Sequence, residues 1–224
     1  MAARRDAASA RTLMPAQLVL PLEPNNAMTR AEFVVAGSNE RAFAFLESFP
    51  GWPAPAAALY GPSASGKTHL ARIWAERANA AVADARDLSA AVDGPAVVEN
   101  IDSAPGFAHE PALFAMLERG APLLLTGRQA PSSWPVALPD LGSRFRALLA
   151  FELGAPDEAL LMALAVKLFA DRQVTVPESV VMHLVRTLER SPAALRDFIQ
   201  RADLRALEEQ KPVNLKLIQS LMAN

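Results

Sequence analysis

The chain has 224 residues, of which 51% are hydrophobic, and a formal net charge of −2 with a pI of about 6.0. This predicts one domain, or one domain with a small lid, and the charge gives no overall basic surface for gripping nucleic acid. Cysteine is absent, which excludes disulfides, cysteine–zinc sites and cysteine nucleophiles, and no apolar run reaches the ~18 residues of a membrane-spanning helix, so we expect a cytoplasmic protein with no membrane partner.

Residues 1–29 are predicted to form a flexible leader that carries one apolar hexapeptide. Residues 17–22 read Gln-Leu-Val-Leu-Pro-Leu and lie between two polar, loop-like stretches. Six residues are too few for a core helix, and Pro21 argues against a central strand. The residues alone leave two interpretations open: a staple on the surface of the protein's own body, or a peptide that binds a partner.

Residues 61–68 match the complete phosphate-binding pattern G-x-x-x-x-G-K-[ST]. An apolar run at 56–60 predicts the preceding strand, and helical spacing of apolar residues from position 70 predicts the following helix. The glycines let backbone N–H groups point at phosphate, and the helix directs its positive end at the same anion. Lys67 would reach the β- and γ-phosphates, and Thr68 would bind Mg²⁺. The predicted phosphate-binding residues are Gly61, Pro62, Ser63, Ala64, Ser65, Gly66, Lys67 and Thr68.

Two further apolar runs, at 96–98 and 123–125, predict buried strands that end in polar residues. Glu99 ends the first and is the candidate acid for Mg²⁺. Asn100 follows, where many ATPases place a second acid that polarises water; an amide cannot act as a general base, so we expect weak intrinsic ATP hydrolysis. Thr126 ends the second run, where such folds place a sensor of the γ-phosphate. The alternative is that these are ordinary polar strand ends.

The remaining sequence predicts helices. Arg144 lies in the segment Leu-Pro-Asp-Leu-Gly-Ser-Arg-Phe, where it is either a helix-surface charge or a functional residue. After a linker near 153–156, apolar stripes predict helices that begin near 157, 177, 192 and 214. The predicted fold class is therefore α/β: a P-loop protein with a parallel sheet flanked by helices in residues 30–154, and a small helical lid in residues 155–224.

Residues 30–224 together resemble the AAA+ ATPases of the bacterial DnaA group. The stretch 31–49 is similar to the opening segment of that group, which implies that Phe33, Val34 and Asn39 lie near adenine. The segment around Arg144 resembles the arginine-finger motif, which implies that Arg144 acts in trans on another subunit's nucleotide.

Several positions depart from the pattern of the group. Glu99 replaces the usual Asp, and Arg128 stands where the group usually has an Asp after the sensor strand. In the lid, ungapped matching puts Ala193 or Ala194 at the place of the sensor arginine, and Arg196 fits only if the helix shifts register.

The sequence is closer to the Hda family, short DnaA homologues that inactivate the initiator, because it has no room for the DNA-reading domain of initiators. That family starts with a peptide of the form QL-x-LPL that binds the sliding clamp, the β subunit of DNA polymerase III, and it carries Asn at the position of Asn100. The resemblance implies clamp contacts by Gln17, Leu18, Leu20, Pro21 and Leu22.

The resemblance also implies partners and a function. The expected ligands are ADP or ATP and Mg²⁺, and Thr68 and Glu99 would hold the Mg²⁺ ion. The expected partners are DnaA, the clamp, and DNA indirectly through the clamp. The protein would promote hydrolysis of DnaA-bound ATP while tethered to the DNA-loaded clamp and so prevent over-initiation. Two alternatives remain: a self-contained ATPase of the helicase-loader type, and a nucleotide-stabilised adaptor in which Arg144 has no catalytic role.

Overall fold

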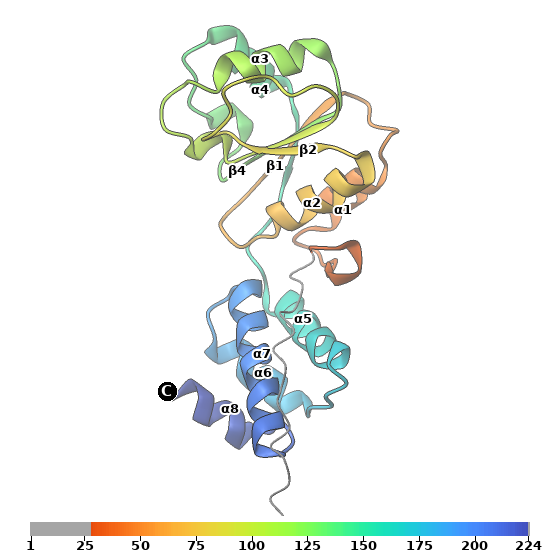
Figure 1. Cartoon of the computed structure of the whole chain (residues 1–224), viewed down its shortest axis with the longest axis vertical. Coiled ribbons are helices and arrows are strands. Elements are labelled where there is room, and N and C mark those ends of the chain that lie inside the picture. The colour runs from red at the N-terminus through yellow and green to blue at the C-terminus, as the bar shows by residue number, and fades with distance from the viewer. Residues whose placement is uncertain (1–27, 224) are drawn as a thin grey trace, which may run out of the picture.

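The computed structural model describes residues 28–223. These residues form a sheet with helices on both faces and a bundle of helices that lies below it in Figure 1. The elements are η1 (Arg30–Glu32), α1 (Glu40–Glu47), β1 (Ala56–Tyr60), α2 (Lys67–Ala78), β2 (Ala81–Asp84), β3 (Ala96–Glu99), η2 (Ile101–Ser103), α3 (Glu110–Arg119), β4 (Leu123–Gly127), η3 (Pro131–Ser133), α4 (Pro139–Ala147), β5 (Leu149–Glu152), α5 (Glu158–Asp171), α6 (Glu178–Thr187), α7 (Pro192–Glu209) and α8 (Leu215–Met222).

The sheet has five parallel strands in the order β2–β3–β4–β1–β5. The inner strands β1, β3 and β4 are buried apolar runs because helices cover both faces of the sheet. The strands predicted at 56–60, 96–98 and 123–125 are confirmed. Because all the strands are parallel, their carboxyl ends and the loops that follow them meet at one edge, where open α/β sheets bind ligands.

Alternate residues of the inner strands pack against different helices. Ala57 and Leu59 belong to a buried cluster with residues of α1 and α2, whereas Ala58 belongs to a cluster with α3 and α4. Val97 and Val98 of β3 divide between the same two clusters, as the twofold period of a strand requires. Figure 1 accordingly shows α1 and α2 on one side of the sheet and α3 and α4 on the other.

Helices α5 to α8 have a core of their own, which includes Leu184, Phe198 and Ile218. Three of these helices begin with a side-chain cap: Asp157 accepts from Leu160 N (2.7 Å), Ser191 from Ala194 N (3.4 Å) and Asn214 from Leu217 N (3.0 Å). The four helices expected after residue 156 are therefore present, with starts close to the predicted ones.

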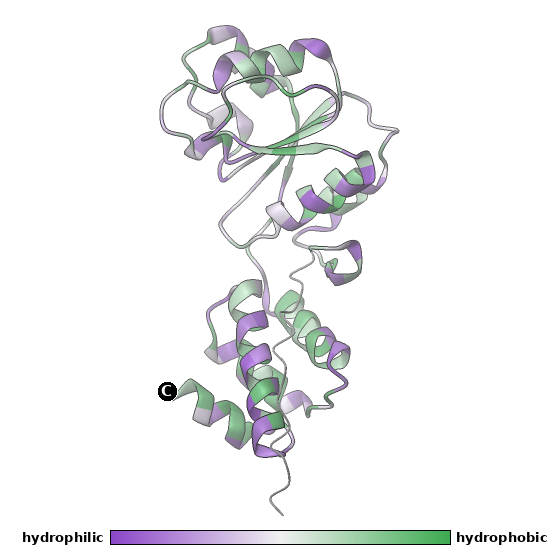
Figure 2. Cartoon of the chain, viewed as in Figure 1, coloured by the Kyte–Doolittle hydropathy of each residue, from purple (hydrophilic) through white to green (hydrophobic). Residues whose placement is uncertain are grey.

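The hydropathy pattern fits this architecture. Figure 2 shows hydrophobic residues concentrated in the strands and hydrophilic residues on the outer faces of the helices. Within residues 28–223, each helix is either too short or too polar to cross a bilayer.

Candidate nucleotide-binding site

The loop between β1 and α2 has a left-handed backbone at Gly61, Ala64 and Gly66. Gly61 has φ of +147°, and a Cβ atom on it would lie 2.1 Å from the carbonyl oxygen of Leu153. Gly66, at φ +96°, forms the left-handed turn into α2. Gly61 therefore lets the P-loop pass against the chain segment that leads to the lid.

Lys67 lies folded over its own loop. Its Nζ donates to Gly61 O (2.8 Å), Pro62 O (2.7 Å) and Ser65 Oγ (3.3 Å). Burial lowers the pKa of Lys67; Asp102 and Glu99 oppose the shift, and Arg128 adds to it. The ammonium group is thus held at the loop by neutral oxygens, and phosphate oxygens would be stronger acceptors for it.

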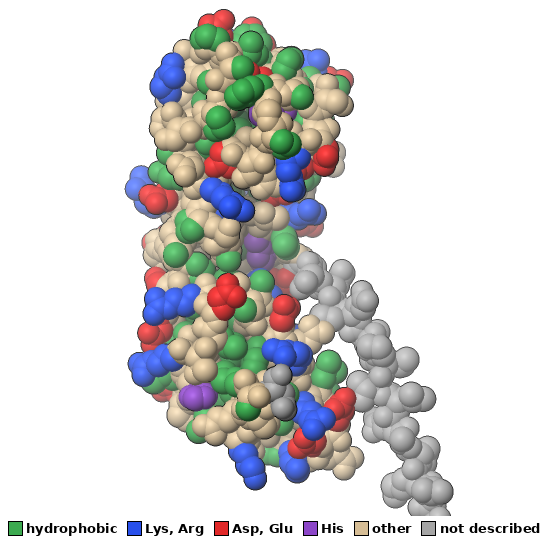
Figure 3. Space-filling model, turned by 90° about the vertical axis from the view of Figure 1, so that its left-hand side faces the viewer, with side chains coloured by type: hydrophobic (Ala, Val, Ile, Leu, Met, Phe, Trp, Pro, Cys, Tyr) green, Lys and Arg blue, Asp and Glu red, His purple; other side chains and the backbone are tan. Residues whose placement is uncertain are grey.

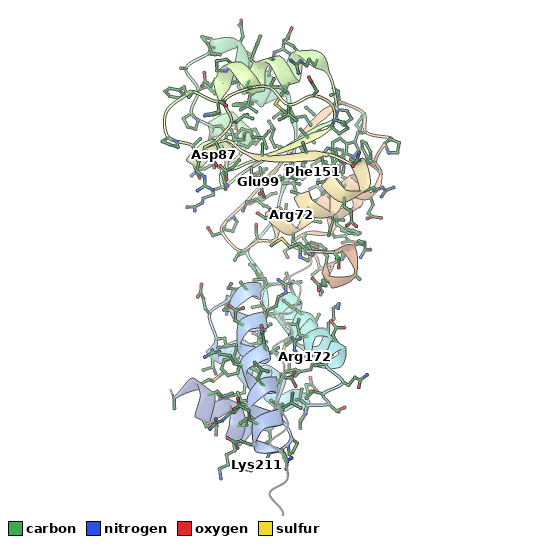
Figure 4. All side chains as sticks on the ribbon, viewed as in Figure 1. Arg72, Asp87, Glu99, Phe151, Arg172 and Lys211 are labelled. Atoms are coloured by element: carbon green, nitrogen blue, oxygen red, sulfur yellow. The ribbon has the colours of Figure 1, made fainter. Side chains whose placement is uncertain are left out.

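Glu99 and Thr68 are the residues expected to hold Mg²⁺, and Thr68 lines the cavity described below. Glu99 ends β3, and its Oε1 is buried without a hydrogen-bond partner, which is unfavourable for a carboxylate oxygen unless a cation or water contacts it. Figure 4 shows Glu99 at the side of the sheet that faces the lid. With one carboxylate and one hydroxyl from the protein, nucleotide phosphate and water would complete the six oxygen ligands of Mg²⁺.

Asn100 is engaged with the neighbouring strand. It has a left-handed backbone (φ +62°), and its Nδ2 donates to Asp84 Oδ2 at the end of β2 (2.7 Å). Arg86 also binds Asp84, and its hydrogen bonds are the largest cause that holds the pKa of the Asp84 carboxyl far below its usual range. The Asn100 amide nitrogen is therefore occupied by its hydrogen bond to the carboxylate of Asp84 on the edge strand.

Thr126 lies buried at the end of β4, beside the carboxyl end of β3. Its Oγ1 accepts from the backbone N–H of Asn100 (3.3 Å), which leaves its hydroxyl proton available for donation. The parallel register pairs Leu59 of β1 with Thr126. The sheet thus brings the P-loop, Glu99, Asn100 and Thr126, which are far apart in the sequence, to the same edge.

A cavity extends from the P-loop to the lid. Its lining combines the P-loop and α2, the segment that enters α1, and residues of α5 and α7: Met28, Phe33, Val34, Asn39, Ala64, Ser65, Gly66, Lys67, Thr68, His69, Leu160, Leu164, Pro192, Ala193 and Arg196. The three residues expected near adenine therefore share one cavity with the phosphate-binding loop. Of the other predicted P-loop residues, Pro62 and Ser63 lie exposed beside it.

Phe33 and Asn39 shape the wall of this cavity. Phe33 stacks on Phe43 (centroids 5.7 Å apart) and meets the edge of His69 (5.1 Å). The Asn39 amide accepts from Ala36 N (3.0 Å) and donates to Val34 O (3.0 Å). Asn39 is buried and locks the turn that presents Val34 to the cavity.

The sequence left a role for Arg196 open, and the structure places it in the cavity wall. Helix α7 begins at Pro192, so Pro192, Ala193 and Arg196 lie on one face of its first turns. Burial lowers the pKa of Arg196, whereas Glu32 and Asp197 raise it. The i to i+3 and i+4 spacing from the helix start brings Arg196 to the cavity.

His69 also lines the cavity and was not among the residues predicted for the site. Its Nε2 lies 2.9 Å from Thr29 O, and burial is the largest cause that lowers its pKa. The neutral ring donates this hydrogen bond, and it ties α2 to the segment that precedes α1. Its position directly after Thr68 was the available sequence signal.

Arg144 is not part of this cavity. It lies on α4, where it forms an ion pair with Glu118 of α3, and its guanidinium lies 5.1 Å from the ring of Phe114. Arg146 is exposed and donates to Ser143 Oγ (3.0 Å). Figure 3 shows basic and acidic side chains interspersed on one face of the molecule. The predicted clamp peptide at 17–22 lies outside the described residues.

The fold of this chain is similar to that of several solved structures. No protein-family model matches the sequence, and neither does a curated protein. The chain is similar to domain III of DnaA from Thermotoga maritima (20% identity, TM-score 0.70, 89% of this chain and 97% of that one). It is also similar to AMPPCP-bound DnaA from Aquifex aeolicus (16%, 0.71, 82% and 67%) and to the RuvB Holliday junction branch migration motor of Thermotoga maritima (16%, 0.67, 88% and 71%).

These similarities show the fold. The five-stranded parallel sheet, the P-loop after β1 and the helical lid form an α/β AAA+ fold, as the sequence predicts. Because RuvB is about as similar as DnaA, the comparison does not by itself select a role.

Proposed function

We propose that this protein is an Hda-type regulator, which inactivates DnaA by promoting hydrolysis of DnaA-bound ATP while tethered to the DNA-loaded β sliding clamp. It would act in the cytoplasm and prevent over-initiation of replication. One observation carries this proposal: Arg144, in the motif that resembles an arginine finger, lies outside its own nucleotide cavity, on α4. A partner's nucleotide can therefore meet it without competition from the home site.

The home site would hold ADP or ATP with Mg²⁺. Backbone N–H groups of the P-loop and Lys67 would bind the phosphates, and the Thr68 hydroxyl and Glu99 would hold the ion. The adenine would lie toward Phe33 and Val34, beneath the lid residue Arg196. One of the similar structures is a DnaA bound to AMPPCP, which supports an adenine nucleotide here.

Intrinsic hydrolysis would be weak. The position after Glu99 carries an amide, which cannot accept a proton from water, and this amide is bonded to Asp84. The helicase-loader alternative requires a self-contained ATPase, so the commitment of Asn100 argues against it. The bound nucleotide would then serve to hold body and lid together.

The chemistry on DnaA would come from Arg144. A guanidinium placed at the γ-phosphoryl group neutralises the charge that develops during transfer, an effect of ~10³–10⁵ in rate in other NTPases. The clamp peptide would raise the local concentration of the protein at replicating DNA. Pro21 restricts the backbone of the peptide, which would reduce the entropy lost on binding.

A second candidate is an adaptor in which Arg144 has no catalytic role. The ion pair between Arg144 and Glu118 and the adjacent ring of Phe114 favour it, since they give the arginine a structural use. Both side chains of this pair are about half exposed, and such pairs contribute only ~0–1 kcal/mol. Removal of Arg144 should therefore barely change folding under either candidate.

The deciding experiment follows labelled ATP on DnaA in the presence of clamp-loaded DNA. Wild type should convert DnaA-ATP to DnaA-ADP, and Arg144→Ala should lose this activity while it keeps nucleotide and clamp binding. Arg144→Lys should restore little of the activity, because an ammonium cannot span two phosphate oxygens as a planar guanidinium does.

Arg146→Ala is the matched control, two residues away on the same helix. Normal conversion by Arg144→Ala would establish the adaptor, and loss only in Arg146→Ala would identify the other arginine as the finger.

A further inference from the structure

Arg128 lies beside the first residue of the P-loop. Strands β1 and β4 run parallel and pair Tyr60 with Gly127. The next residues along the two strands are Gly61 and Arg128, so these residues leave the sheet side by side at its carboxyl edge. Lys67 donates to Gly61 O from the same place. The register of the sheet thus places the backbone of Arg128 beside the P-loop, next to the nucleotide cavity rather than among the residues that line it.

The loop that carries Arg128 is fixed by its neighbours. Asp102 Oδ2 accepts from the backbone N–H groups of Arg128 (2.6 Å) and Gln129 (2.7 Å). On the other side, Trp134 Nε1 donates to Gln129 O (2.8 Å), and a Cβ on Gly127 would lie 2.6 Å from that nitrogen. The backbone at 127–129 is therefore held between a carboxylate and an indole ring, which fixes the base of the Arg128 side chain.

The guanidinium of Arg128 is exposed and has no hydrogen bond or ion pair among residues 28–223. The nearby carboxylate of Asp102 is occupied, because its Oδ2 serves two backbone groups and its Oδ1 accepts from Ser103 Oγ (3.3 Å). Arg128 is close enough to Lys67 for its charge to lower the pKa of that lysine. Two cations thus lie near each other, and no side-chain anion among residues 28–223 pairs with Arg128.

We propose that Arg128 is a second cationic ligand for the terminal phosphates of a nucleoside 5′-diphosphate or triphosphate bound at the P-loop. This inference rests on the nucleotide site of the proposed function. A guanidinium gives two parallel donors to adjacent phosphate oxygens, so it adds a directional contact to the point charge of Lys67. Its consequence is selective: Arg128 strengthens the binding of ADP and ATP and leaves the binding of AMP unchanged, since the neighbouring Lys67 reaches the β- and γ-phosphates rather than the α-phosphate.

Asp102 is the positioning residue for this contact. It touches the backbone of Arg128 and Gln129 rather than phosphate, so it acts by holding the loop. Removal of either Asp102 or Arg128 should therefore disable the same interaction. Their effects on ADP affinity should not add, as expected of residues that act as one unit.

The test measures the affinities of purified full-length protein for ADP, ATP and AMP by calorimetry. Arg128→Gln should weaken ADP and ATP roughly tenfold, the effect of one charge-assisted hydrogen bond, and leave AMP unchanged. Asp102→Ala should give a similar loss, with no further loss in the double variant. Arg146→Gln controls for the loss of one positive charge, and Lys67→Ala is the positive control. Gln129→Ala controls for a side-chain change in the same loop that leaves its backbone hydrogen bonds in place.

Unchanged ADP affinity in Arg128→Gln would overturn the inference. So would an equal loss for AMP, or an equal loss in Gln129→Ala, because either result would trace the effect to a distorted loop. The readout involves neither DnaA nor the clamp, so a failed conversion assay does not bear on it. If wild type binds neither ADP nor ATP, the proposed nucleotide site itself is overturned, and this inference with it.

Discussion

At the scale of single residues, the polar side chains near the P-loop form hydrogen bonds with other protein groups. Asn100 illustrates what the sequence could and could not predict. Its place after a buried strand predicted a position at the active edge of the sheet. Its bond to Asp84 could not be predicted, because Asp84 ends a short, partly exposed strand 16 residues earlier.

The first prediction concerns Asn100→Asp. The new carboxylate would face Asp84 Oδ2, which now lies 2.7 Å from Asn100 Nδ2. Two carboxylates in contact raise the pKa of one of them. Because the folded-state pKa then exceeds the unfolded value, the variant keeps its stability at low pH and loses it as pH rises through the folded value. The melting-temperature difference from wild type should widen between about pH 4 and pH 7.

Asn100→Gly is the matched control for this titration. Glycine keeps the left-handed backbone at position 100 and removes the hydrogen bond without adding a charge. Its melting-temperature difference from wild type should stay nearly constant over the same pH range. A constant difference in Asn100→Asp as well would show that Asp84 and residue 100 are not coupled.

At the scale of elements, strongly patterned segments were predictable and weakly patterned ones were not. The apolar runs of β1, β3 and β4 and the striped helices of the lid are explicit in the sequence. The edge strands β2 and β5 are only four residues long, and their burial is partial or alternating, so no long apolar run marks them in the sequence. Tertiary pairing, rather than local pattern, makes them strands.

The P-loop itself depends on an element that its motif does not mention. Gly61 passes against Leu153, the residue that follows β5, and Leu153 N donates to Tyr60 O (2.7 Å). The motif predicted that glycine is needed for the approach of phosphate. The structure adds that this glycine is also needed for the approach of the chain that continues into the lid.

The second prediction is that Gly61→Ala is more destabilising than another substitution of a positive-φ glycine. The new Cβ would lie 2.1 Å from Leu153 O, a contact that requires backbone to move. In the control Gly94→Ala, φ is +78° but nothing lies within 4 Å, so only backbone strain of ~1 kcal/mol or somewhat more is added. Denaturant unfolding should show a loss of ~3 kcal/mol or more for Gly61→Ala. Equal losses in the two variants would contradict the close approach.

At the scale of the whole molecule, the cavity exists because distant parts of the chain converge on the P-loop. The segment that enters α1 supplies Phe33 and Val34, and the first turns of α7 supply Arg196. The family resemblance predicted that Phe33 and Val34 lie near the nucleotide. The place of Arg196 in the cavity could be seen only once the start of α7 was known. The fold was therefore largely predictable, whereas the side-chain pairings between segments required the structure.

The third prediction concerns the clamp peptide of the leader. Its motivation is the sequence Gln-Leu-Val-Leu-Pro-Leu at 17–22, which resembles a clamp-binding motif. Replacing Leu20 and Leu22 together by Ala would remove two apolar contacts worth ~3–5 kcal/mol, enough to abolish a micromolar interaction. Gln17→Ala should weaken binding as well. Binding is measured with purified clamp, and the melting temperature of the body, which the structure describes from residue 28, should not change.

The matched control for the tether replaces Leu13 and Met14 by Ala, which removes two large apolar side chains from the same leader but outside the motif. This variant should bind the clamp like wild type. Undiminished affinity of the Leu20 and Leu22 variant would contradict the tether, and an equal loss in the control would show that the leader binds by general hydrophobicity. Because Arg144 lies on α4 in the body and the motif lies in the leader, the tether variant should still convert DnaA-ATP when its own concentration is high. It should fail only where the clamp is needed to concentrate it on DNA.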